Sequence, residues 1–116
     1  MIPGPAGAKI WIACGPTDMR KGFDGLAMLV QDVMKRNPHC GHVFCFRGKR
    51  ADRIKLLWWD GTGLCLYAKR LERGRFVWPA ARDGVVLLSP AQLSMLTEGI
   101  DWRSPLRTSE APQRAG

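Results

Sequence analysis

Residues 54–71, Ile-Lys-Leu-Leu-Trp-Trp-Asp-Gly-Thr-Gly-Leu-Cys-Leu-Tyr-Ala-Lys-Arg-Leu, decide the fold. Two segments rich in apolar and aromatic residues, 54–59 and 64–71, flank the sequence Asp60-Gly61-Thr62-Gly63. Because Asp and Gly accept the backbone conformations of a tight turn, this pattern is a strong signal for a β-hairpin. The centre of the chain is therefore predicted to be antiparallel sheet.

On the N-terminal side of this hairpin, the sequence predicts a strand, a helix and a second strand. Residues 9–14 form a short apolar run that stops at Gly15-Pro16. Thr17 and Asp18 offer capping side chains for a helix, which Asn37-Pro38 ends. Its apolar residues recur at helical spacing: Phe23, Leu26, Ala27, Val30, Val33 and Met34.

From His42 to Phe46 the apolar period changes to two, which is typical of a strand. Val43 and Cys45 are predicted to face one way, and His42, Phe44 and Phe46 to face the other.

On the C-terminal side, a short strand is predicted at Val85–Leu88, followed by the sequence Ser89-Pro90-Ala91-Gln92. Ser caps a helix, Pro suits its first position and Gln completes a capping box, so a short helix to Glu98 is expected, with Gly99 as its stop. The fold class is therefore α+β, a small antiparallel β-sheet with one main helix packed on it and a short C-terminal helix. Residues 1–103 are expected to form a single domain and residues 104–116 a flexible C-terminal tail.

The overall composition indicates a soluble protein with an anionic partner. The 116 residues carry 18 Lys and Arg against 10 Asp and Glu, a net charge of +8. No apolar run is long enough for a membrane span, and residues 1–14 lack the features of a signal peptide, so we expect a cytoplasmic protein with reduced cysteines. Nucleic acid is the leading partner by charge, although ribosomal, anionic-membrane and acidic protein partners fit the same surplus.

The positive charge gathers around the predicted hairpin. Between Arg47 and Arg82 there are ten basic residues against three acids, a local charge of +7. We predict that nine of them bind nucleic acid: Arg47, Lys49, Arg50, Arg53, Lys55, Lys69, Arg70, Arg73 and Arg75. Aromatic residues interleave with them and either stack on bases or form the core: Trp58, Trp59, Tyr67, Phe76 and Trp78.

Neither a metal site nor a catalytic site is predicted. His39, Cys40, His42 and Cys45 are close in sequence, but their spacing matches no zinc motif, and strand geometry sends His42 and Cys45 to opposite faces. The carboxylates are scattered: Asp18 and Asp24 suit a helix start, Asp60 a turn, and Asp52 and Glu72 pairing with adjacent arginines. No cofactor is expected.

Several long motifs resemble a known family, the accessory protein encoded by the second reading frame of insertion-sequence family sixty-six (TnpB, Orf2-like). The resemblance runs from Trp11 to Trp102 through residues 15–26 (GPTDMRKGFDGL), 52–61 (DRIKLLWWDG), 69–79 (KRLERGRFVWP) and 99–102 (GIDW). Gly48 and Ala51 depart from it, because Asn and Arg or another polar residue are expected at these positions in the basic loop.

This resemblance implies a non-catalytic role in transposition beside a separate transposase and a further accessory protein. Two hypotheses follow. In the first, the basic hairpin contacts transposon DNA; in the second, the protein binds the transposase without touching DNA. A metal-dependent nuclease is disfavoured because the carboxylates do not cluster.

Overall fold

The predicted hairpin forms one edge of a five-stranded sheet. A computed structural model gives the structure of residues 7–103, and the predicted tail, residues 104–116, lies outside the described residues. The elements are β1 (Ile10–Pro16), α1 (Phe23–Asp32), β2 (Val43–Arg47), β3 (Arg53–Trp59), β4 (Leu64–Arg70), the 3₁₀ turn η1 (Ala81–Asp83), β5 (Val85–Leu88) and α2 (Pro90–Thr97).

The hairpin turn is built by the side chain of Asp60. Its Oδ1 accepts the backbone N–H groups of Thr62 and Gly63, each at 2.9 Å. These two donors hold the pKa of Asp60 at about 2, below its ordinary value. Gly61 has φ +104°, a conformation that other residues rarely adopt. The predicted turn is confirmed.

The strand order is β4-β3-β2-β1-β5, and the α+β fold class is confirmed. Three of the four described pairings are antiparallel, whereas β1 and β2 run parallel, so the sheet is mixed rather than purely antiparallel. The reason is the position of α1 between β1 and β2. A helical crossover returns the chain to the end where β1 began, and the next strand then runs in the same direction.

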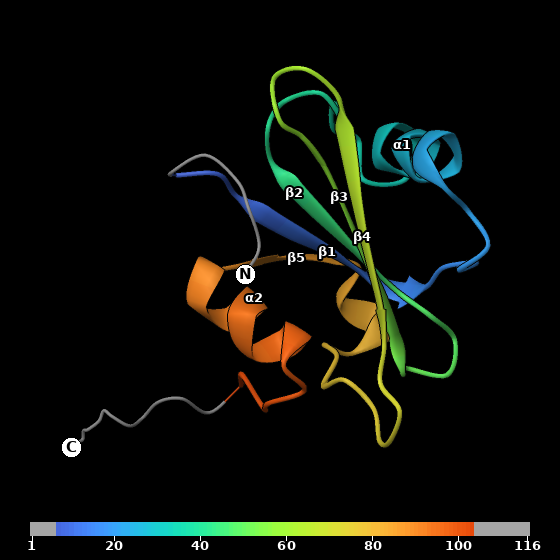
Figure 1. Ribbon diagram of the computed structural model, residues 1–116, viewed down its shortest axis with the longest axis vertical. Helices are drawn as coiled ribbons and strands as arrows, with labels where there is room; N and C mark the ends of the chain where they lie inside the picture. Colours follow the sequence, from blue (N-terminus) through green and yellow to red (C-terminus); the bar gives the residue numbers. More distant parts are fainter. Residues whose placement is uncertain (1–6, 104–116) are drawn as a thin grey trace.

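The two helices cover opposite faces of the sheet, which lies between them in Figure 1. Under α1, Leu26 and Val30 pack on Phe44, Phe46 and Leu57. The other face carries the larger cluster, to which α2 contributes Leu93 and Leu96 and the strands contribute Ile12, Val43, Cys45, Ile54 and Leu56. The predicted alternation in β2 is confirmed, and both of its faces are buried.

The two helices begin differently. Ser89 caps α2 through the predicted capping box with Gln92, and Gly99 follows the helix at φ +75°. The prediction that Thr17 or Asp18 caps α1 was wrong, because its N-cap is Gly22 and has no side-chain cap hydrogen bond. No helix among residues 7–103 has the length and apolar content to cross a membrane.

Lys35 lies just after α1 with φ +57°, a left-handed conformation that favours glycine. We expect Lys35→Gly to raise the free energy of unfolding by about 0.5–1 kcal/mol, since relief of the Cβ clash exceeds the added entropy of the unfolded chain. Thermal unfolding followed by circular dichroism measures this. Lys35→Ala is the control, because it removes the charge but keeps Cβ. An equal gain in both variants would contradict the backbone explanation.

Candidate nucleic-acid interface

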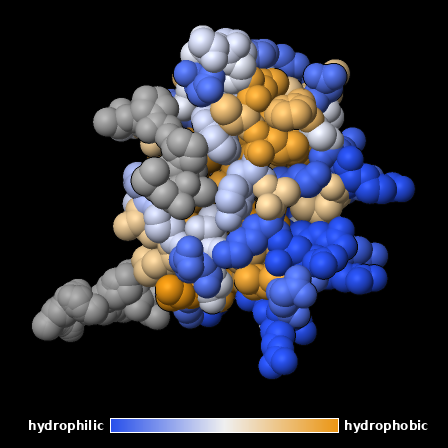
Figure 2. All heavy atoms as spheres, viewed as in Figure 1, coloured by the Kyte–Doolittle hydropathy of each residue, from blue (hydrophilic) through white to orange (hydrophobic). Residues whose placement is uncertain are grey.

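The fold brings the nine predicted basic residues to one end of the sheet. β2 ends at Arg47, β3 begins at Arg53 and β4 ends at Arg70, so these three residues lie at the same end. The adjoining loops carry Lys49, Arg50, Arg73 and Arg75. We call this set of nine residues the basic end. Figure 2 shows hydrophilic side chains gathered where β4 and its neighbouring loops end.

Arg53 and Arg70 form the centre of the basic end. They are direct cross-strand partners and both are exposed. Like charges opposite each other on neighbouring strands repel. Glu72, whose Oε2 lies 3.6 Å from the Arg70 guanidinium, offsets this only weakly because its side chain is 84% exposed. A bound anion between the two guanidinium groups would relieve the repulsion.

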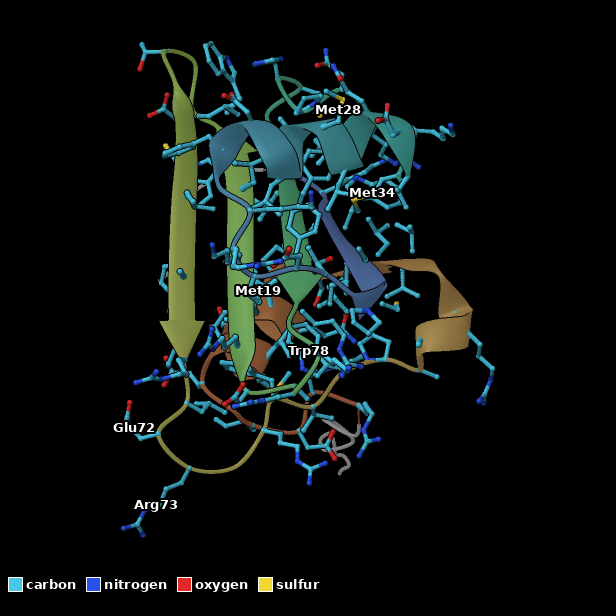
Figure 3. All side chains as sticks on the ribbon, turned by 90° about the vertical axis from the view of Figure 1, so that its right-hand side faces the viewer. Met19, Met28, Met34, Glu72, Arg73 and Trp78 are labelled. Carbon is cyan, nitrogen blue, oxygen red and sulfur yellow. The ribbon has the colours of Figure 1, made fainter. Side chains whose placement is uncertain are left out.

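Two hollows lie on either side of Arg53, and both also include Met19. One, of about 410 Å³, extends over β3 and β4 to Lys55, Lys69, Arg70 and Glu72. The other, also about 410 Å³, extends over the β2–β3 loop to Lys49, Arg50 and Asp52 and across to Thr17, Asp18 and Arg20. In Figure 3, Met19 lies between α1 and this end of the sheet. The exposed cations therefore line a concave surface.

Two lysines among the nine predicted residues already bind the protein's own carbonyl groups. Lys55 Nζ donates to the backbone oxygen of Lys21 at 2.9 Å, and Lys69 Nζ donates to the backbone oxygen of Thr97 at 2.8 Å. Thr97 is the last residue of α2, so the Lys69 ammonium also faces the negative end of the helix dipole. These contacts connect the sheet to the segment before α1 and to the end of α2.

We therefore expect Lys69→Met to lower the free energy of unfolding by about 1–2 kcal/mol through loss of this helix-end contact. The affinity for duplex DNA should change little, within about threefold, because one phosphate contact at most is removed. Urea unfolding and fluorescence anisotropy measure the two quantities. A large loss of DNA affinity with unchanged stability would show that Lys69 acts on DNA.

Arg47 lies on the opposite face from Arg53 and is held in place by its surroundings. Its guanidinium carbon is 5.7 Å from the centre of the Trp78 ring, and its Nε donates to the Gly48 oxygen at 3.3 Å. Trp78 in turn donates from Nε1 to the Ala51 oxygen at 3.1 Å. Ala51 adopts φ +67°, and its carbonyl also accepts the N–H of Phe76 at 2.9 Å. The loops after β2 and β4 are thus connected.

The interleaved aromatic residues belong mainly to the core. Trp58 and Phe76 are buried, with 7% and 3% of their surface exposed, and Tyr67 and Trp78 are half-buried against the same cluster. Trp59 makes an edge contact with His39 at 5.2 Å. Base stacking is therefore not available to Trp58 or Phe76, and the alternation of a sheet explains their spacing between charged residues.

The sequence interpretation missed Arg20. This side chain reaches the second hollow and forms a two-pronged contact with Asp18, from Nε at 3.0 Å and from the terminal nitrogen at 2.9 Å. The Arg20 hydrogen bonds hold the pKa of Asp18 well below its ordinary value. Asp101 and Arg103 repeat the arrangement, so the spacing Asp-x-Arg was a usable signal.

The other carboxylates of the basic end differ from one another. Glu72 pairs with Arg70 as predicted. The same prediction for Asp52 was wrong, because no ion pair with it occurs within the described part of the chain. Asp52 Oδ1 is buried without a hydrogen-bond partner.

The two histidines between α1 and β2 make separate structural contacts. His42 Nδ1 accepts a hydrogen bond from Trp11 Nε1 at 3.3 Å, and His39 lies against Trp59. Cys45 is fully buried, which raises the pKa of its thiol well above the ordinary value, whereas Cys40 is exposed. Among residues 7–103, no group of three or more His, Cys, Asp or Glu side chains is placed to hold a metal ion.

The fold and this end of the sheet define a small α+β protein in which basic side chains outnumber acids at one end. The chain belongs to the family described as IS66 Orf2 like protein, whose model matches residues 8–107. The family resemblance is therefore confirmed, and with it a role accessory to insertion-sequence transposition rather than that of a catalytic transposase.

Two similar proteins come from Sinorhizobium fredii (strain NBRC 101917 / NGR234). The uncharacterized protein y4hO is 54% identical over 108 residues, which cover 93% of this chain and 94% of y4hO. The uncharacterized protein y4jC is 42% identical over 102 residues, which cover 88% of this chain and 87% of y4jC. No solved structure matches the chain.

Proposed function

We propose that this accessory protein is non-catalytic and contacts transposon DNA through its basic end in the bacterial cytoplasm. The observation that supports this most is the pair Arg53 and Arg70, two exposed arginines directly opposite each other and bordered by concave basic surface. Phosphate binding relieves their repulsion, whereas an empty site leaves it in place.

The chemistry of the free side chains fits phosphate. A guanidinium group donates two parallel hydrogen bonds to one phosphate and remains charged at every physiological pH. The side chains of six basic residues make no hydrogen bond to protein atoms among the described residues, apart from the exposed ion pair of Arg70 with Glu72: Lys49, Arg50, Arg53, Arg70, Arg73 and Arg75. These six residues are the proposed phosphate contacts.

An NMR titration tests where DNA binds. When duplex DNA from a transposon end is added, the amide signals of Arg50, Arg53 and Arg70 should shift most. Those of Thr62 and Gly63, at the hairpin tip at the other end of β3 and β4, should stay in place. Shifts centred on the hairpin tip or on α1 would contradict the proposal.

A second candidate, contact with the transposase or the further accessory protein, is favoured by an apolar hollow of about 530 Å³ beside α1. Its apolar lining includes Leu29, Val33, Met34, Phe46 and Val85. Val33 is 60% exposed, and Phe23 and Met28 of α1 are also exposed. Co-purification with the transposase should then survive high salt and be lost in Val33→Asp, since apolar contact is not screened by ions.

A further inference from the structure

The outer edge of β4 has no partner strand among the described residues. β4 is the first strand in the order β4-β3-β2-β1-β5, and Figure 3 shows nothing alongside its outer edge. An edge strand presents unpaired N–H and C=O groups that can pair with another strand. This edge is independent of the proposed DNA contact, which concerns side chains.

The hydrogen bonds at both ends of the hairpin fix which residues point their backbone groups outward. Asp60 N–H donates to Gly63, and Leu71 N–H donates to Asp52. Because hydrogen-bonded pairs alternate along an antiparallel ladder, residues 65, 67 and 69 direct their N–H and C=O groups toward β3. Residues 64, 66, 68 and 70 therefore direct theirs to the open edge.

The two edges of the sheet differ in protection. β5, at the other edge, has only four residues, between Gly84 and Ser89-Pro90. β4 has seven residues, contains no Pro or Gly and pairs with β3 without a bulge. Charges occur only at its last two positions. Native proteins shorten, bend or charge an edge to prevent pairing, and β4 is left without these features over residues 64–68.

The side chains along β4 are incompletely covered. Leu64 and Leu66 lie on the α1 face and Cys65 and Tyr67 on the α2 face, where each packs against its core cluster but remains half-buried. A further strand beside β4 would extend both faces and remove the remaining apolar surface from water.

A second copy of β4 fits this edge in an antiparallel register centred on Tyr67. Leu66 then lies opposite Ala68 of the second copy, and Leu64 lies opposite Arg70, so all outward-pointing backbone groups meet in hydrogen-bonded pairs. The strand length separates the two Arg70 side chains by about 20 Å. This exceeds the screening length of about 10 Å at 0.1 M salt, so like charges do not oppose the pairing at close range.

We infer that the protein forms a two-fold symmetric dimer by antiparallel pairing of β4 with β4 of a second copy, giving one continuous sheet. The basic ends of the two copies then point in opposite directions. Since each copy carries a net charge of +8, salt favours this dimer by screening long-range repulsion. Salt dependence therefore has the opposite sign to that expected for DNA binding.

Sedimentation equilibrium at high salt tests this with Ala68→Pro. Ala68 is exposed and its N–H points outward, so proline removes a donor that β3 does not use. The wild type and the control Ala68→Thr, which keeps the N–H, should approach twice 13.0 kDa as concentration rises, whereas Ala68→Pro should stay at 13.0 kDa. Matching circular dichroism spectra show that the variant is folded.

A disulfide variant gives an answer even if Ala68→Pro does not fold. In the proposed dimer, the Tyr67→Cys side chains of the two copies face each other across the two-fold axis and are close enough to form a disulfide. The Thr62→Cys side chains, at the exposed hairpin tips, do not face each other. With Cys40 and Cys65 changed to Ser, mild oxidation should cross-link Tyr67→Cys much faster than Thr62→Cys. Equal rates, a wild type that stays at 13.0 kDa, or a folded Ala68→Pro that dimerises like Ala68→Thr would overturn the inference.

Discussion

Changing Arg50, Arg53 and Arg70 together to glutamine (R50Q, R53Q, R70Q) is expected to weaken binding to duplex DNA roughly 100-fold near physiological salt. Each arginine that binds a phosphate releases about one condensed cation from the duplex. Three lost contacts should also reduce the slope of log K against log salt by about 2 to 3. Fluorescence anisotropy of a labelled duplex at several salt concentrations measures both quantities.

The choice of these three residues depends on the geometry. Lys55 is also among the nine residues predicted from the sequence, but its ammonium group already binds the Lys21 carbonyl. Arg70 replaces it because it lies opposite Arg53 and is exposed. Removal of three repelling charges should leave the fold intact, so a lower affinity cannot be attributed to unfolding.

The matched control replaces three exposed basic residues away from the basic end with glutamine: Lys9, Lys35 and Arg36. Lys9 precedes β1, and its carbonyl accepts the N–H of Val43 at the start of β2, opposite the end where β2 reaches Arg47. Both triple variants lose three positive charges, so a difference between their DNA affinities shows where on the protein the DNA binds. If both weaken DNA binding equally, the protein attracts DNA only through its net charge and the basic end has no special role.

Phe44→Ala is expected to lower the free energy of unfolding by about 3–5 kcal/mol, because it removes buried surface and leaves a cavity. Phe44 is 0% exposed and packs beneath Leu26 and Val30 of α1. The total free energy of unfolding of a domain of this size is about 5–15 kcal/mol, so this loss is a large share of its stability.

Urea unfolding checks this prediction, with Phe44→Leu as the control that keeps most of the buried volume and should cost much less. The measurement tests whether apolar packing holds α1 on the sheet. A cost below about 1 kcal/mol for Phe44→Ala would mean that α1 is not held by this contact.

Local patterns predicted which strands and helices form, but they predicted neither the bounds of α1, which begins at Phe23 and ends at Asp32, nor the arrangement of the elements. The hairpin at Asp60–Gly63 and the capping box of Ser89 and Gln92 depend on residues close in sequence, and both are confirmed. The parallel pairing of β1 with β2 depends on where α1 sends the chain, which apolar periodicity does not encode.

The candidate site shows the same division. The high density of positive charge in the sequence was the basis for predicting the basic residues of the site. The register of the β3–β4 hairpin places Arg53 opposite Arg70. The carbonyl contacts of Lys55 and Lys69 involve residues 34 and 28 positions away, so no local pattern reveals them. Arg20 was missed because it lies outside the charged segment; its Asp-x-Arg spacing indicates the contact with Asp18 but not the place of Arg20 in the second hollow.

The most direct test of the DNA contact is the salt dependence of wild-type binding to two fluorescent duplexes, a transposon end and a scrambled sequence. For the six proposed phosphate contacts, log K should fall with log salt with a slope of about −5. This slope should appear for both duplexes, because phosphate contacts carry no sequence information, and any preference for the transposon end would add to it. Absence of binding at low salt, or binding without salt dependence, would contradict the account.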